Sequence, residues 1–281
     1  MVRPKLFFDT NICIYAANGT IPADEWARVS KYVGRHYRYC ISFITLKELF
    51  GKVTRGQDTF FEKNKKPLQV LYGTVKRSFL PFPTVFAIRT VLGLPVARKS
   101  KTSELSEEVL SENMLKAVLR VSSKAELEAG IPVRNSHRWK HRFDLDHFDE
   151  HENQPQHEHA GLLQGMRQGL IERPDAMKWA AWILHQHEVT PYDEDCQKLV
   201  ATLDAAYLYG VSLSRFTDNP NYNFHKPEHL TSWGDTLQML YLCDNHMHFL
   251  TTDKDFLDYT KGSFQADRIH LYRNFVRSVL S

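Results

Sequence analysis

The segment Lys5-Leu6-Phe7-Phe8-Asp9-Thr10-Asn11 places a short apolar run directly before polar residues. Continuous rather than alternating hydrophobic residues are typical of a strand that is buried on both faces of a parallel sheet. Asp9 follows this predicted strand, and open α/β sheets collect their ligands beyond the carboxyl ends of the strands. Taken alone, Asp9 is explained more simply by a turn, so its interpretation depends on whether other acids reach the same edge.

The composition is that of an ordinary globular chain. The 281 residues are 42% hydrophobic and 25% charged, which suits one large domain or a domain with an insertion. No run approaches the roughly 18 apolar residues of a membrane span, and Met-Val-Arg-Pro-Lys leads into the first strand without a signal peptide. We therefore expect a cytoplasmic protein with no membrane partner. The net charge of +3 permits a nucleic-acid partner without requiring one.

Further segments near both ends of the chain also read as short apolar strands next to helices. Residues 39–43 predict a second strand that passes directly into a helix over residues 45–50. A helix from Ser232 to about Cys243 precedes predicted strands at residues 247–250 and 269–272. Strands that alternate with helices imply right-handed crossovers, so the two ends predict an α/β fold with a mainly parallel sheet.

The middle of the chain has a different character. Apolar spacing predicts helices over residues 84–92, 103–120, 175–187 and 195–209. We assign residues 1–55 and 229–281 to a discontinuous α/β core and residues 56–228 to a mainly helical insertion. Because the insertion lies between the two parts of the core, a lid or substrate-selecting subdomain is our hypothesis for it.

Four acids occupy comparable positions along the predicted core. Asp9 and Asp253 follow strands, whereas Glu48 and Asp235 lie in the first turns of helices. Thr45-x-x-Glu48 and Ser232-x-x-Asp235 also match or approximate a capping box, which is the simpler explanation for each acid alone. Jointly, carboxylates within about 5 Å would repel by roughly 3 kcal/mol per pair, and a divalent cation would remove that cost. Oxygen ligands favour Mg²⁺ or Mn²⁺, one or two of which can promote phosphodiester hydrolysis.

These residues carry a resemblance to a known family. Phe8-Asp9-Thr10-Asn11, Ser42-Phe-Ile-Thr45-Leu-Lys-Glu48-Leu, Asp235 at a helix start and Leu250-Thr-Thr-Asp253-Lys-Asp255-Phe256 resemble, in order, the four signature segments of PIN-domain nucleases. The similarity covers roughly the first 55 and the last 50 residues. It implies a three-layer α/β/α fold and a metal-dependent endoribonuclease. The implied metal-binding and catalytic acids are Asp9, Glu48, Asp235 and Asp253, supported by Asn11, Thr251 and Asp255.

The resemblance leaves the biological role open. Glu48 and Asp235 are separated by 186 residues, far more than in compact toxin members of the family. An RNA substrate is expected, whereas an inhibitory protein partner and a homodimer are alternatives that the sequence does not decide. Two other functions compete. One is a non-catalytic RNA- or protein-binding scaffold, and the other is a haloacid-dehalogenase-like phosphatase, which would need an acid where Asn11 stands.

Other polar features have simpler explanations. Histidines and acids between His137 and His159 match no fixed metal motif, and the four cysteines form no C-x-x-C pair. Asp204 lies too far from Asp253 for a single helix–strand connection, so the polar side of a helix explains it best. Cations around an aromatic residue can track phosphates and stack bases, although a solvated surface is the simpler explanation for the candidates Arg134, Arg138, Trp139, Lys140 and Arg142.

Overall fold

The computed structural model describes residues 3–55, 57–73, 77–96, 106–130, 176–216 and 232–280. Its centre is a five-stranded sheet in the order β3-β2-β1-β4-β5, and every pair of neighbours is parallel. The strands are β1 (Lys5–Phe8), β2 (Arg38–Ile41), β3 (Arg77–Phe79), β4 (Met247–Thr251) and β5 (Ile269–Leu271). The predicted α/β fold with a parallel sheet is therefore confirmed.

The sheet is covered on both faces because its strands are hydrophobic at successive positions. Leu6 and Phe8 belong to one buried cluster, whereas Phe7 between them belongs to the other. The neighbouring strands alternate in the same way, with Ile41 on the first face and Cys40 on the second. This arrangement matches the expectation for a strand buried on both sides.

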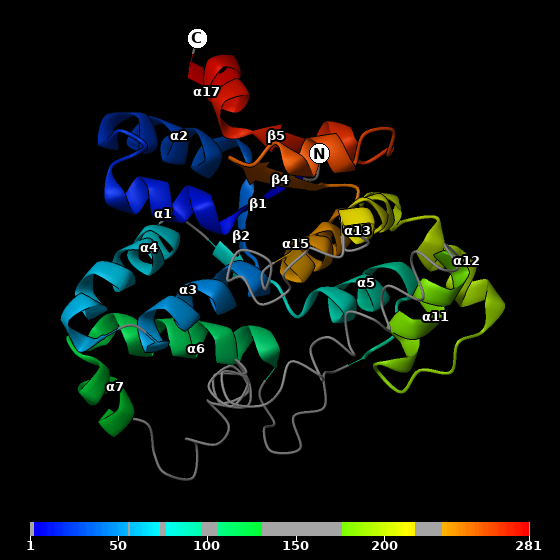
Figure 1. Cartoon of the computed structure of the whole chain (residues 1–281), viewed down its shortest axis with the longest axis horizontal. Coiled ribbons are helices and arrows are strands. Elements are labelled where there is room, and N and C mark those ends of the chain that lie inside the picture. The colour runs from blue at the N-terminus through cyan, green and yellow to red at the C-terminus, as the bar shows by residue number, and fades with distance from the viewer. Residues whose placement is uncertain are drawn as a thin grey trace.

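Two layers of helices cover these faces, and they lie on opposite sides of the sheet in Figure 1. The first layer contains α1 (Thr10–Asn18), α2 (Ala23–His36), α3 (Phe43–Arg55), α4 (Phe61–Gly73), α6 (Glu107–Arg120), α7 (Lys124–Gly130) and α17 (Tyr272–Leu280). The second contains α5 (Pro83–Leu92), α11 (Ala176–His185), α12 (Asp193–Val200), α13 (Asp204–Phe216), α15 (Ser232–Met239), the 3₁₀ turn η3 (Leu240–Cys243) and α16 (Asp255–Tyr259). Short 3₁₀ turns also lie at η1 (Asp58–Phe60) and η4 (Ala266–Arg268). The three-layer α/β/α fold is thus the observed architecture.

Local sequence signals explain several helix boundaries. Gly19 has φ 83° directly after α1, as expected for a left-handed residue that ends a helix. The Ser42 hydroxyl accepts hydrogen bonds from the backbone amides of Ile44 and Thr45 at 3.2 and 3.3 Å. Because Ser42 caps the helix in this way, α3 begins at Phe43 and β2 ends at Ile41, earlier than the sequence predicted.

The residues between 56 and 228 contribute to the same α/β body. The edge strand β3 lies in this range and pairs with β2 from Tyr39–Arg77 to Ile41–Phe79. Helix α4 packs on α1 and α3, and α5 packs on η3. The predicted boundary at residue 55 therefore does not separate the sheet from a helical insertion.

A buried glutamine fixes the connection between α12 and α13, where the sequence predicted one continuous helix over residues 195–209. Gln265 is 1% exposed. Its Nε2 donates to the carbonyl oxygens of Thr202 and Leu242 at 2.6 and 2.8 Å, and its Oε1 accepts from Ala205 N at 2.8 Å. The prediction of one helix was wrong because this distant amide supplies partners to a backbone that interrupts the helical pattern.

Within the described ranges, no helix has both the length and the apolar character that a bilayer span requires.

Candidate metal centre

The site begins at the point where the order of strands reverses. From β1 the chain builds β2 and β3 on one side of the sheet, and it later returns to build β4 and β5 on the other. In open α/β sheets such a switch point opens a crevice at the carboxyl ends of the two central strands. Asp9 is the first residue after β1, and its backbone amide donates to Leu250 O of β4 at 2.9 Å. Asp253 follows β4 by two residues, so both acids lie at this point.

Thr251 links the acids of the two central strands. Its Oγ1 donates to Asp9 Oδ2 at 3.0 Å and accepts a hydrogen bond from Asp253 N, also at 3.0 Å. Asp253 Oδ1 in turn accepts from the backbone amide of Asp255 at 2.9 Å. These bonds hold Asp9 and Asp253 in fixed relation across the end of the sheet.

Glu48 makes a contact that the capping-box explanation does not provide. Its Oε2 accepts a hydrogen bond from Thr10 Oγ1, the hydroxyl beside Asp9. Thr45, the expected cap, instead uses its hydroxyl to donate to Phe8 O at 2.9 Å. Glu48 is therefore oriented toward the end of β1 and not toward its own helix terminus.

Asp235 reaches the same region because a glycine precedes it. Helix α15 packs on α3. A Cβ at Gly234 would lie 3.1 Å from Ile44 Cγ2 and 3.4 Å from Glu48 Oε1. The absence of a side chain at Gly234 therefore lets the backbone beside Asp235 lie directly against Glu48.

The carboxylates act on one another electrostatically. Burial raises the pKa of Asp9 to about 6, with Asp253 adding to the rise while bonds from Thr251 and from the backbone oppose it. Burial also raises the pKa of Glu48 to about 7, and the charge of Asp9 contributes. The pKa of Asp235 lies well above its usual value because of burial and then the charges of Glu48, Asp9, Asp253 and Asp255. All four predicted metal ligands thus share one electrostatic neighbourhood.

The donor set matches a hard divalent cation in chemistry. The groups that surround one another are carboxylate oxygens, and their mutual repulsion is the kind that a bound cation relieves. As placed, no three His, Cys, Asp or Glu side chains among the described residues are arranged so that they could hold an ion. Ion binding would therefore require the carboxylates to reorient toward a common point.

The supporting residues and the remaining candidates take different positions. Asp255 begins α16, and burial followed by the charge of Asp253 raises its pKa. The backbone of Asn11 helps to limit the rise in the pKa of Asp9. The predicted nucleic-acid contacts Arg134, Arg138, Trp139, Lys140 and Arg142 lie outside the described residues.

Tyr209 was missed by the sequence reasoning. It lies on α13 and is 3% exposed, and its pKa is raised by burial and then by the charges of Asp235, Asp253 and Asp255. Its sequence context is an amphipathic helix without a motif, so no local signal separated it from core residues.

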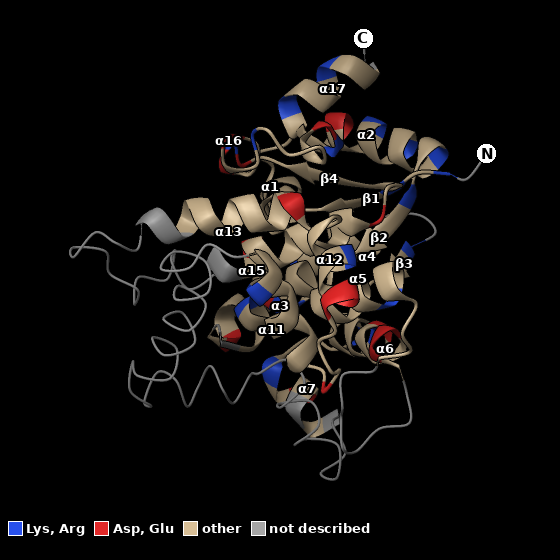
Figure 2. Cartoon of the chain, turned by 90° about the vertical axis from the view of Figure 1, so that its right-hand side faces the viewer, with Lys and Arg blue, Asp and Glu red and all other residues tan. Residues whose placement is uncertain are grey.

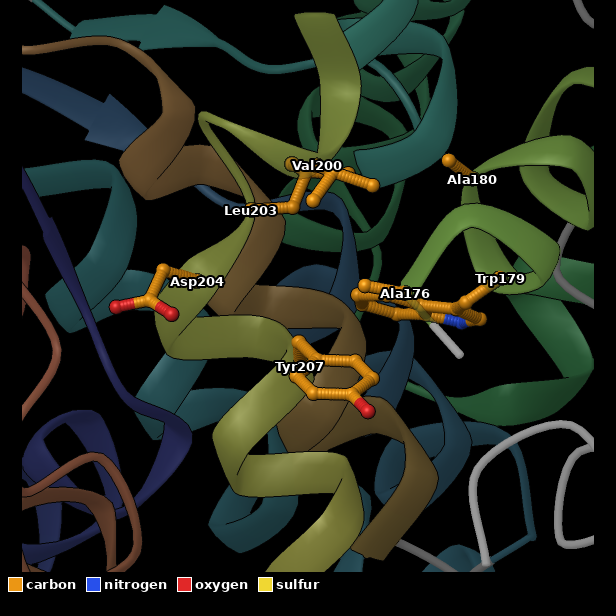
Figure 3. Close-up of a pocket in the computed structure, with 7 residues that line it drawn as sticks. All are labelled: Ala176, Trp179, Ala180, Val200, Leu203, Asp204 and Tyr207. Carbon is orange, nitrogen blue, oxygen red and sulfur yellow. The ribbon is translucent and has the colours of Figure 1, made fainter. Parts of the chain in front are cut away.

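Asp204 belongs to a different feature of the same layer. It lines a mainly apolar cavity of about 180 Å³ between α11, α12 and α13, together with Ala176, Trp179, Ala180, Val200, Leu203 and Tyr207 (Figure 3). Trp179 is buried in the second hydrophobic cluster. Asp204 therefore lines a cavity of the helical layer. The acidic edge is formed by Asp9 and Asp253 after β1 and β4, by Asp235 in the first turn of α15 and by Glu48 of α3. The prediction that Glu48 lies in the first turn of its helix was wrong, because α3 begins at Phe43 and Glu48 is its sixth residue.

Opposite charges mark the two ends of the sheet. Three neighbouring parallel strands begin with a cation, namely Lys5, Arg38 and Arg77. Figure 2 shows basic residues on α2, on α17 and near β2 and β3, while α16 with its acids lies at the end of the sheet away from the N-terminus. The acidic edge is thus separated from the basic residues that begin the strands.

Gly234→Ala tests the close approach of α15 to α3. Ala is the better helix former by about 1 kcal/mol, but its Cβ would press on the buried Ile44 and would contact Glu48. We expect the free energy of unfolding to change by less than about 1 kcal/mol, because these effects oppose each other, while Mn²⁺ affinity falls by about tenfold. Isothermal titration measures the Mn²⁺ affinity, and urea denaturation measures the free energy of unfolding.

Gly34→Ala in α2 is the control, because nothing lies within 4 Å of the added Cβ. Unchanged Mn²⁺ affinity in Gly234→Ala would show that this approach does not set the site.

Comparison of the chain with protein-family models, with curated proteins and with solved structures returned no match.

Proposed function

We propose that this protein is a PIN-like nuclease that hydrolyses RNA phosphodiester bonds with Mg²⁺ or Mn²⁺, as an endonuclease. The observation that carries the proposal is the electrostatic coupling of acids near the switch point of a parallel sheet. Burial raises the pKa values of Asp9, Glu48 and Asp235, and the charges of neighbouring acids, Asp253 among them, add to the rise. A cluster of this kind would repel a polyanion unless cations neutralised it. The resemblance of the four segments to PIN-domain nucleases supports RNA as the substrate.

The four carboxylates would hold the cation, and their neighbours orient them. When bound, the ion would activate water and neutralise charge on the phosphodiester. The Thr251 hydroxyl donates a hydrogen bond to Asp9 Oδ2, and the Thr10 hydroxyl donates one to Glu48 Oε2. Asp9 also accepts hydrogen bonds from the backbone amides of Thr10 and Asn11. The Asp255 amide fixes Asp253 in the same way.

We also propose a cytoplasmic location. The cysteines Cys13, Cys40, Cys196 and Cys243 are all free thiols in buried positions. Free thiols persist most readily in a reducing compartment, which supports this assignment.

Cleavage of single-stranded RNA by the full-length protein tests the proposal. The assay compares Mn²⁺, Mg²⁺ and EDTA, and uses single-stranded DNA of the same sequence as a second substrate. We expect internal cleavage of RNA that requires a divalent ion. Intact RNA with both metals, at protein concentrations above that of the substrate, would refute the function.

A non-catalytic scaffold is the second candidate, because the described carboxylates are not arranged around an ion as placed. Titration with Mn²⁺ separates the two functions. A nuclease must bind the ion saturably and lose that binding in Asp9→Asn, whereas a scaffold that binds RNA or protein through other surfaces shows no such dependence.

A further inference from the structure

Helices α2 and α17 present exposed cations at one end of the molecule. Lys31 and Arg35 lie four residues apart on α2, and Arg273 and Arg277 lie four residues apart on α17. Residues at this spacing share one face of a helix. None of the four forms a salt bridge with an acidic side chain of the described residues. Each helix therefore carries a stripe of two positive charges that no described acid neutralises.

Packing of α17 on α2 brings the two stripes together. The ring of Phe275 on α17 lies 6.0 Å from the ring of Tyr32 on α2, in an edge-to-face arrangement. Each of these rings lies between the two cations of its own helix in the sequence. Figure 2 shows basic segments on both helices at the same end of the molecule. We define the basic surface as Lys31, Arg35, Arg273 and Arg277.

The stripes are unfavourable for the helices that carry them. Like charges four residues apart on a helix repel one another. Arg273 also lies in the first turn of α17, where the helix dipole disfavours a cation and where the helix has no acid to compensate it. Arg35 and Arg277 lie in last turns and agree with the dipole. Local helix stability therefore does not explain Lys31 and Arg273.

An exposed ring accompanies these cations. His36 is the last residue of α2, and its ring stacks on Tyr32 with centroids 4.3 Å apart. The exposed face of a stacked ring can receive a nucleobase. The apolar side of α17 is turned inward, since Tyr272 and Phe275 are each 5% exposed. Cations beside an exposed ring are the combination that follows a nucleic-acid backbone and stacks its bases.

The basic surface begins at the same border of the sheet as the acidic edge. Strand β5 pairs with β4, and Leu271 is aligned with Thr251. Asp253 lies two residues beyond Thr251, and Arg273 lies two residues beyond Leu271. Neighbouring strands are about 4.8 Å apart, so α17 starts one strand away from the turn that carries Asp253. An RNA strand that leaves the acidic edge beside β5 therefore has Arg273 as its next phosphate contact.

We propose that the basic surface binds the phosphate backbone of single-stranded RNA while His36 stacks on one of its bases. The inference rests on the proposed nuclease function for the identity of the nucleic acid, but the contacts themselves need no metal ion. Guanidinium and ammonium groups displace the counterions of the backbone, so this binding depends on salt. The surface holds the RNA beside the acidic edge whether or not cations are bound there.

Binding in EDTA tests the surface without cleavage. Fluorescence anisotropy with a labelled single-stranded RNA of about 20 nucleotides, between about 50 and 200 mM KCl, gives the affinity and its salt dependence. Each phosphate contact adds about −0.7 to the slope of log K against log salt. We expect a wild-type slope of about −2.8 or steeper. Arg273→Gln/Arg277→Gln should make it shallower by about 1.4 and weaken binding about tenfold at 100 mM KCl, and Lys31→Gln/Arg35→Gln should do the same.

Two further variants separate this surface from general charge. Lys63→Gln/Lys66→Gln removes two exposed cations from α4, which packs on α1 and α3. This control lowers the net charge by the same amount and should keep the wild-type affinity and slope. His36→Ala at pH 8 should weaken binding about fivefold with an unchanged slope, because a stacking contact releases no counterions.

Wild-type affinity and slope in both pairs of surface variants, or an equal loss in the α4 control, would overturn the inference. Equally tight binding of a poly-glutamate chain would also overturn it, because the surface would then suit acidic proteins. The nuclease function survives these results if the wild type still cleaves RNA with Mn²⁺. Conversely, RNA binding that depends on the basic surface, in a protein that cleaves with neither metal, would overturn the nuclease function and leave the RNA-binding surface in place.

Discussion

Asp9→Asn is expected to abolish RNA cleavage and, in metal-free buffer, to make the protein more stable. The activity should fall at least about 100-fold, which is the upper range for loss of a group that only supports a metal ligand. The stability gain follows from burial. A carboxyl whose pKa rises from 3.8 to about 6 on folding costs the folded state up to about 3 kcal/mol once it is ionised. Asparagine has nearly the same shape and no charge, so this cost disappears.

Urea denaturation in EDTA at pH 7.5 measures the gain, and the RNA assay with Mn²⁺ measures the loss. Asp204→Asn is the matched control, because it neutralises an acid that lines the cavity of the helical layer. The control should keep its activity and change the free energy of unfolding by less than about 0.5 kcal/mol. Lower stability of metal-free Asp9→Asn would contradict the electrostatic account, and retained cleavage would contradict the assignment of Asp9 as a ligand.

The second large effect is a pH dependence that a divalent cation should remove. An acid with a raised pKa in the folded state favours folding while it is protonated. The stability that such an acid contributes is therefore fully present below its pKa in the unfolded state. This contribution is lost as the pH rises through its pKa in the folded state. For Asp9 and Glu48 this window runs from 3.8 and 4.5 to about 6 and about 7. The metal-free protein should lose several kcal/mol of this contribution between about pH 4 and pH 7.

Other groups titrate in the same range with the opposite sign. Burial lowers the pKa of His248 to about 4, and it lowers that of His270, so these side chains oppose folding as the pH falls. The useful quantity is thus the difference in stability between wild type and Asp9→Asn at each pH, in which the histidines cancel. This difference should grow from pH 4 to pH 7 in EDTA.

Mn²⁺ at about 100 times its dissociation constant should stabilise the wild type by about 2.7 kcal/mol and leave the variant unaffected. A difference that does not vary with pH would count against the coupled carboxylates.

The sequence was most informative where structure is decided locally. The opening strand, the two strands near the end of the chain and the placement of Asp9 and Asp253 after them could be predicted from apolar runs and from their polar ends. The boundaries moved by only one or two residues, as at Ser42, whose hydroxyl caps α3. The common position of the four acids was an inference from crossover geometry.

The features that escaped prediction depend on contacts between distant parts of the chain. Strand β3 has only three residues, too few for a periodic pattern, and its partner β2 is nearly 40 positions away. The break between α12 and α13 is stabilised by Gln265, and Glu48 is oriented by Thr10. The charges of Asp235, Asp253 and Asp255 act on Tyr209 because α13 packs on α15 and α16. No window of sequence contains these pairs.

The position of β3 also limits how the chain can be shortened. This strand forms the outer border of the sheet beside β2, and Arg38 Nε donates to Ser78 Oγ across them at 2.9 Å. Without β3, the backbone of β2 would present unpaired amides and carbonyls to solvent, which is a template for pairing with other molecules. A minimal version made by joining residue 55 to residue 229 would therefore be expected to self-associate into aggregates, so a soluble truncation must retain residues 77–79.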